Sequence, residues 1–256
     1  MKRIYYYIAL CLTSVILGSC AEVDNYDAPT ETIRGTVIDV GTGKPLQGEV
    51  SGEGGVGSRI KLLELSWSDN PTPYYVATKQ DGSFTNTKIF AGKYKITAEG
   101  AFVSLVQPTA APPVDKSQTL DIKGITEVNF SVEPLLRVEW IGEPVLNANG
   151  TITVQARVTR GTTNAAFLGN VTDINLYINN TQYVGNNNYD NRFAKLTAYS
   201  GTTGNAVLGQ TLTITTIGGA VLTKRDLYLR VGARTALTVD GQRVFNYNEP
   251  KKITIP

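Results

Sequence analysis

The sequence predicts an all-β chain made of two β-sandwich domains. Short runs rich in β-branched residues recur along the chain and are separated by Gly, Pro, Asn and Asp. Within several runs, apolar residues alternate with polar ones, which is typical of strands that have one buried face and one wet face. No long segment keeps apolar residues at the spacing of an amphipathic helix. We therefore expect antiparallel sheets that pack face to face.

The N-terminus has the pattern of a secretory signal. A basic start at residues 1–3 is followed by an apolar run over residues 4–17, which is too short to span a bilayer. Leu17-Gly18-Ser19-Cys20 resembles a lipobox, in which the cysteine thiol is lipidated and cleavage then makes that cysteine the first residue. We expect residues 1–19 to be a signal peptide and Cys20 to anchor the mature chain to a membrane. An ordinary signal peptide with a coincidental cysteine is the alternative.

Composition excludes several function classes. Two of the 24 basic residues, Lys2 and Arg3, lie in the signal, so the mature chain has 22 basic and 22 acidic side chains. This balance gives no basic footprint, and we expect no nucleic-acid partner. The chain has no histidine, and its two cysteines are Cys11 and Cys20, so the folded part has neither the commonest general base nor a thiol. We predict no enzyme, no cofactor and no metal site.

Four segments follow from the pattern. We expect a signal peptide over residues 1–19, a flexible lipidated tether over 20–32, and domains over 33–132 and 133–256. The boundary lies at Glu133-Pro134, because proline cannot donate to a strand ladder.

Strand candidates in the first domain include residues 59–67 and 74–78. Asp81-Gly82 predicts a β-hairpin with a type I′ turn, in which both central residues take positive φ. Gly41 and Gly43 are predicted to supply two positive φ angles in an earlier turn. In the second domain, strict alternation marks buried faces at Leu136, Val138 and Trp140; at Ile152, Val154, Ala156 and Val158; at Ile174, Leu176 and Ile178; and at Leu227, Leu229 and Val231.

Four ordered motifs carry a resemblance to a known module: Gly35-Thr-Val-Ile-Asp39, Thr42-Gly-Lys-Pro45, Asp81-Gly-Ser-Phe84 and Gly92-Lys-Tyr94. In this order they resemble the carboxypeptidase-regulatory or Cna-B-type domain, a transthyretin-like β-sandwich. The alternation in the second domain is typical of a fibronectin- or immunoglobulin-like sandwich.

With Asn25-Tyr-Asp-Ala-Pro29 and the lipobox, the chain resembles Bacteroidetes lipoproteins of the family called domain of unknown function 3823. That resemblance implies an outer-membrane address, at the cell surface or on the periplasmic face. It also implies SusC-like and SusD-like proteins of glycan uptake as partners.

Exposed aromatic side chains beside polar ones are the expected platform for a sugar, whose C–H faces stack on flat rings. We predict two such groups of ligand-binding residues: Trp67, Asp69, Asn70 and Tyr74, and separately Tyr183 and Tyr189. Trp67 has the alternative of being a core residue or part of a hydrophobic lid, as tryptophans are mostly buried. Tyr75, Tyr94 and Trp140 are interpreted as core.

Two function classes remain. The leading hypothesis is a non-catalytic envelope lipoprotein that binds glycan or assembles with a glycan importer; the alternative is a structural stalk that binds no carbohydrate. A binder is expected to gather exposed aromatic rings in a cleft, whereas a stalk is expected to bury or scatter them. Glu133, Glu139 and Glu143 near the domain boundary are interpreted as solvated charges, and Asp190 with its neighbouring asparagines as a polar loop rather than a calcium site.

Overall fold

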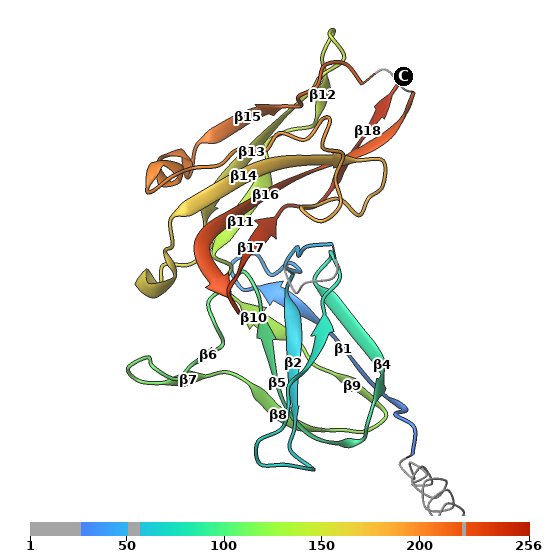
Figure 1. Cartoon of the computed structure of the whole chain (residues 1–256), viewed down its shortest axis with the longest axis vertical. Helices are drawn as coiled ribbons and strands as arrows, with labels where there is room; N and C mark the ends of the chain where they lie inside the picture. The colour runs from blue at the N-terminus through green and yellow to red at the C-terminus, as the bar shows by residue number, and fades with distance from the viewer. Residues whose placement is uncertain (1–26, 51–56, 222–223) are drawn as a thin grey trace, which may run out of the picture.

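The chain folds into two β-sandwiches that stack along the long axis of the molecule (Figure 1), and this confirms the predicted all-β class. The computed structural model describes residues 27–50, 57–221 and 224–256. The expected signal peptide and Cys20 lie outside the described residues. Within them, no helix is both long enough and apolar enough to cross a membrane.

Two four-stranded sheets form the first sandwich. One sheet has the order β10 (Phe130–Val132), β1 (Glu31–Asp39), β4 (Ser83–Ile89), with β9 (Ile125–Glu127) also paired to β1. The other has the order β3 (Tyr74–Ala77), β2 (Arg59–Glu64), β5 (Gly92–Glu99), β8 (Gln118–Ile122). Apolar side chains from both sheets interlock between them, and Tyr94 is buried among them as expected. A small hairpin of β6 (Val106–Gln107) and β7 (Val114–Asp115) lies beside this sandwich.

The turn at Asp81-Gly82 corrects the hairpin prediction. Strand β3 before it pairs with β2, whereas β4 after it pairs with β1, so the turn carries the chain from one sheet to the other. Only Gly82 has positive φ, at 78°. The Asp81 carboxylate instead accepts hydrogen bonds from the N–H and hydroxyl of Ser83, at 3.0 and 2.7 Å. The dipeptide thus fixes a local turn, while core packing decides which strands become neighbours.

The second sandwich also has two four-stranded sheets. In one, β11 (Leu136–Trp140), β13 (Ile152–Arg160) and β12 (Val145–Leu146) lie in that order, with β15 (Thr211–Thr215) on β13. In the other, the order is β14 (Val171–Asn179), β16 (Arg225–Val239), β17 (Gln242–Tyr247), with β18 (Lys251–Ile255) on β16. Two 3₁₀ turns, η1 (Ala165–Phe167) and η2 (Thr203–Val207), lie between strands. The alternating residues from the sequence are buried between the sheets, apart from Trp140, which is half-buried.

The outer face of β14 is not wet, contrary to expectation. Tyr177 on that face is fully buried and packs with Phe245 and Tyr247 of β17. The asparagine-rich segment after β14 folds over these rings: Val184 is buried there, and the Tyr189 ring centre lies 5.2 Å from that of Tyr177. The segment predicted as an exposed polar loop is therefore a cover for the sheet.

A carboxylate of the first domain is buried in the second. Glu49 follows β1 and is 2% exposed. The hydroxyl of Tyr247 donates to one of its oxygens, and the N–H of Asn187 donates to the other at 3.4 Å. A Cβ at Gly185 would lie 2.4 Å from the carboxylate, so only glycine leaves room for it. The sequence segments 47–50 and 185–187 are therefore fitted to each other across the domain junction.

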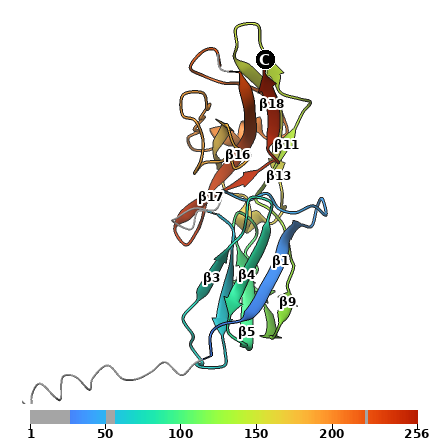
Figure 2. The same cartoon turned by 90° about the vertical axis from the view of Figure 1, so that its right-hand side faces the viewer.

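Backbone hydrogen bonds reinforce the junction. The Ala101 carbonyl accepts from the N–H of Leu135 and from the side-chain amide of Asn246, both at 2.9 Å. The N–H of Val103 donates to the Glu133 carbonyl at 2.8 Å. Figure 2 shows the two sandwiches meeting end to end at this junction.

We expect Gly185→Ala to lower the stability of the whole chain, because the new methyl group would push against the buried Glu49 carboxylate. Overpacking of this kind costs about 1–3 kcal/mol. Thermal unfolding followed by circular dichroism measures the loss. Gly48→Ala is the matched control, since a Cβ there meets its nearest atom at an ordinary 3.4 Å. Equal melting temperatures for the two variants would contradict a close fit between Gly185 and the Glu49 carboxylate.

Candidate functional site

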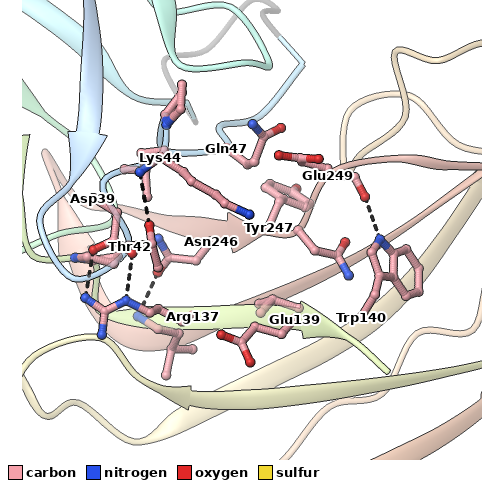
Figure 3. Close-up of a pocket in the computed structure, with 16 residues that line it drawn as sticks. Asp39, Thr42, Lys44, Gln47, Arg137, Glu139, Trp140, Asn246, Tyr247 and Glu249 are labelled. Atoms are coloured by element: carbon pink, nitrogen blue, oxygen red, sulfur yellow. Dashed lines mark hydrogen bonds and ion pairs between the residues drawn. The ribbon is translucent and has the colours of Figure 1, made fainter. Parts of the chain in front are cut away.

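A pocket of about 370 Å³ lies at the domain junction (Figure 3). Its walls are the turn after β1, strand β11 and the segment that leads from β17 to β18. We call it the junction pocket, and the following residues line it: Asp39, Thr42, Lys44, Pro45, Leu46, Gln47, Pro134, Leu136, Arg137, Val138, Glu139, Trp140, Asn246, Tyr247, Asn248 and Glu249.

One end of the pocket is fixed by an ion pair between the domains. The Arg137 guanidinium donates Nε–H to Asp39 Oδ2 and Nη2–H to Asp39 Oδ1, each at 2.7 Å. A Cβ at Gly41 would lie 2.2 Å from Arg137 Nη2, so any larger residue would require the guanidinium to shift from its present position. Gly43 alone of the two turn glycines has positive φ, at 69°. Gly41 therefore gives space to the guanidinium and has no unusual backbone conformation.

Strand β11 presents a free edge to the pocket. The backbone N–H and C=O groups of odd-numbered residues along this stretch face β13. At its two ends, the Leu135 carbonyl accepts from the Gly161 N–H at 3.1 Å, and the Ile141 N–H donates to the Gln155 carbonyl at 2.9 Å. Even-numbered residues face the other way, and among the described strands β11 pairs with β13 alone. The N–H of Leu136 donates to the Asn246 side chain at 3.0 Å. The backbone groups of Val138 point the same way and give the pocket a donor and an acceptor at fixed positions.

Trp140 forms part of the opposite end. Its ring packs against the second-domain core, as expected, but it is only half-buried and also lines the pocket. Its Nε1–H donates to the Glu249 carbonyl at 2.7 Å, which holds the ring in place. Figure 3 shows Lys44 and Gln47 across the pocket from Glu139 and Trp140. The sequence pattern does not reveal this role, because alternation alone puts Trp140 on the core face.

The residues predicted around Trp67 lie elsewhere. Strand β2 ends at Glu64, earlier than expected, so Trp67 lies in the β2–β3 connection and is 64% exposed. The core alternative for Trp67 is therefore wrong. Asp69 and Asn70 are exposed in the same connection. None of these three residues lines the junction pocket.

The two tyrosines of β3 are both exposed. The expectation that Tyr75 is a core residue is therefore wrong. The buried face of this edge strand is the one that carries Val76, so Tyr75 points outward. There the Arg59 guanidinium carbon lies 3.9 Å from the centre of its ring. Tyr74 accepts a hydrogen bond from the Asn86 side chain at 2.7 Å. Trp67 and Tyr74 are thus both exposed, the first near the start of the β2–β3 connection and the second at the first position of β3.

Tyr183 and Tyr189 do not form one exposed cluster. Tyr183 is 54% exposed, whereas Tyr189 packs against Tyr177 in the cover of β14. Asp190 is held by Arg192, whose Nη2–H and Nε–H donate at 2.6 and 2.9 Å, and this lowers the pKa of the carboxyl below its usual range. The described part of the chain holds no group of three or more acidic, histidine or cysteine residues arranged to bind a metal.

We expect acid to weaken the junction through Asp39. Burial alone would raise the pKa of this carboxyl, but hydrogen bonds and charge from Arg137, with the Gly41 N–H, outweigh burial and lower it below 3.8. A lowered folded-state pKa means that the stabilisation is present above pH 3.8 and is lost as the pH falls through the folded-state value. Unfolding by urea at a series of pH values checks this. Asp39→Asn should be less stable at pH 7 and should lose less stability between pH 4 and pH 2; an unchanged slope there would contradict the assignment.

Family comparisons agree with this architecture. Residues 31–133 match the model described as the N-terminal domain of protein of unknown function DUF3823, and residues 141–251 match the domain of unknown function DUF3823_C. No curated protein matches the chain.

Solved structures extend the comparison. A DUF3823 family protein from Bacteroides uniformis is 36% identical, with a TM-score of 0.79, over 89% of this chain and 100% of its own. A second protein from the same organism, described as a "putative carbohydrate binding protein", is 20% identical with a TM-score of 0.61 over the same shares. A DUF3823 family protein from Parabacteroides merdae is 21% identical with a TM-score of 0.62, also over 89% of this chain and 100% of its own. The last two likenesses show a shared fold, while the first, with the domain matches, shows that this chain belongs to the DUF3823 family.

Proposed function

We propose that the chain is a non-catalytic lipoprotein of the cell envelope that binds carbohydrate in the junction pocket. The observation that carries the proposal is the combination of the half-buried Trp140 ring with the free edge of β11 in one hollow. A sugar ring stacks its C–H face on an aromatic side chain, while its hydroxyl groups bond to polar groups around it. Strand-edge backbone groups suit hydroxyl recognition because they are fixed before the ligand arrives.

The size and charge of the pocket narrow the ligand class. Its volume of about 370 Å³ falls in the range of small-molecule sites, roughly 300–1,000 Å³, and suits a short stretch of a longer glycan. Its lining carries two basic side chains and three acidic ones: Lys44, Arg137, Asp39, Glu139 and Glu249. This slight excess of negative charge favours neutral sugars over uronic acids or sulfated sugars.

The state of Asp39 argues against its being the general acid of a glycosidase. A glycosidase needs a general acid whose pKa is raised so that it holds a proton near neutral pH. Asp39 is held in the opposite state, since Arg137 keeps the pKa of its carboxyl below the ordinary value. The relative from Bacteroides uniformis that is described as carbohydrate-binding shares the fold and supports the same function.

A structural stalk is the second candidate. The end-to-end stacking of the sandwiches and the hydrogen bonds across the junction favour it (Figure 1). In both cases we propose outer-membrane attachment through Cys20 and an association with SusC-like and SusD-like proteins, at the cell surface or on the periplasmic face.

Trp140→Ala is expected to weaken carbohydrate binding by roughly 5–10-fold, because a stacked ring contributes on the order of 1 kcal/mol. The measurement is affinity electrophoresis against a panel of neutral polysaccharides, followed by calorimetry on the best ligand. Trp67→Ala is the matched control and should leave affinity unchanged. Loss of binding in Trp67→Ala but not in Trp140→Ala would place the sugar on the β2–β3 connection instead. Failure of the unaltered chain to bind any polysaccharide would favour the stalk.

Cys20→Ala should release the protein from membranes, since this thiol is the proposed attachment point. Detergent phase partitioning of cell extracts compares the variant with the unaltered chain. The unaltered chain should enter the detergent phase and the variant the aqueous phase. Cys11→Ala is the control and should partition like the unaltered chain; equal partitioning of all three would refute lipidation at Cys20.

A further inference from the structure

The end of the first domain that faces away from the second is where the chain enters the fold. Glu31 at the start of β1 pairs with Ile89 at the end of β4, and the N–H of Thr32 donates to the Gly124 carbonyl at 2.8 Å. Gly92 at the start of β5 pairs with Ile122 at the end of β8. The β4–β5 and β8–β9 turns therefore meet the start of β1 at one end, at the bottom of Figure 1.

The β2–β3 connection lies at the same end. The N–H of Leu65 donates to the Lys93 carbonyl at 2.7 Å, and the Lys93 N–H donates to the Ser66 hydroxyl at 2.8 Å. These bonds fix the connection beside the β4–β5 turn. The second domain lies at the opposite end of the same strands, where Asp39 closes β1 and meets Arg137.

Large apolar side chains are exposed on all three connections at this end. Leu65 is 37% exposed and Trp67 64% in the β2–β3 connection, Phe90 is 44% exposed in the β4–β5 turn, and Ile125 is 65% exposed just after the β8–β9 turn. We call these four residues the apolar tip. All four lie at the same end of the domain, and exposed apolar side chains that lie together mark an interaction surface.

We infer that the apolar tip contacts the lipid headgroup region of the membrane to which Cys20 is attached. The inference rests on the lipid attachment in the proposed function. Ten residues lie between Cys20 and Glu31, so the start of β1, at the end that carries the tip, lies within about 40 Å of the anchor even when that segment is fully extended. Tryptophan is enriched at the membrane–water interface, and Phe, Leu and Ile gain free energy by entering the boundary of the acyl chains.

Charges around the tip define the kind of surface. Lys88, Lys93 and Lys123 are exposed near it, and so are Asp69 and Asp121. Lys93 and Asp121 are cross-strand partners, so their charges largely offset each other. The tip therefore needs no anionic lipid, and we expect contact with zwitterionic phosphatidylcholine that depends little on salt.

The two tryptophans of the chain allow a direct test. A chain that begins at Cys20 keeps every described strand, and the Bacteroides uniformis relative crystallised as a chain that matches only 89% of this one, so this form is expected to fold. Its single thiol is coupled to a maleimide phospholipid in phosphatidylcholine vesicles with brominated acyl chains. Trp140→Phe leaves Trp67 as the only reporter, and Trp67→Phe leaves Trp140.

Trp67 emission should shift to shorter wavelength and be quenched by the brominated lipid, whereas Trp140 emission should not change. In the Trp140→Phe chain, Phe90→Ser with Ile125→Ser should reduce the quenching at least twofold. Tyr183→Ser, which alters a similarly exposed ring on the second domain, should leave the quenching intact. Unquenched Trp67, or equal quenching of both tryptophans, would overturn the inference. Chemical coupling makes the result independent of lipidation in cells and of sugar binding, which the two earlier experiments address.

Discussion

The buried carboxylate of Glu49 is the constraint on which the junction depends. Taking a charge out of water costs several kcal/mol unless hydrogen bonds replace the lost hydration. One replacement is local, from the Val50 N–H at 2.8 Å, and the others come from the second domain, through the Tyr247 hydroxyl and the Asn187 N–H. Burial, with the negative charge of Glu49, raises the pKa of Tyr247 well above its ordinary value, so the phenol keeps the proton that it donates.

Arg230 packs against the ring of Tyr247. It is fully buried, donates to the Asn248 carbonyl at 2.8 Å and to the Val184 carbonyl at 3.2 Å, and holds its guanidinium carbon 4.2 Å from the centre of the Tyr247 ring. Burial lowers its pKa to about 10, which still leaves it charged at neutral pH. The positive charge, the aromatic ring and the carboxylate thus form a stack that spans both domains. This stack also adjoins the junction pocket. Tyr247 belongs to the stack and lines the pocket, and Gln47, which also lines the pocket, lies two residues before Glu49.

The sequence predicted those features that depend on local pattern. Alternating residues such as Val154 and Leu229 are buried because a strand with one apolar face can hide it only against another sheet. Features that depend on which strands become neighbours could not be predicted from the sequence pattern. The Asp81-Gly82 turn joins two sheets, and Tyr75 points outward because Val76 takes the inner face of an edge strand.

The candidate site escaped prediction for the same physical reason. Asp39 and Arg137 are separated by 98 positions, and the pocket between them exists only once two separate domains meet. The one available signal was Trp140 at the end of its strand, followed closely by Gly142 and Pro144. The polar character of the asparagine-rich segment after β14 predicted an exposed loop. The segment instead covers aromatic rings that alternation alone would place in contact with water.

The end-to-end stacking of the domains also decides how the molecule carries load. If the anchor is at one end and the ligand at the junction, a polymer pulled away from the cell stretches the first sandwich along its strands. Strands β1 and β10 run parallel there, so rupture requires several ladder bonds to shear at once instead of opening one by one. With that anchor and that ligand, the first sandwich would resist shear along its strands, which would suit a ligand that is long, mobile and under tension.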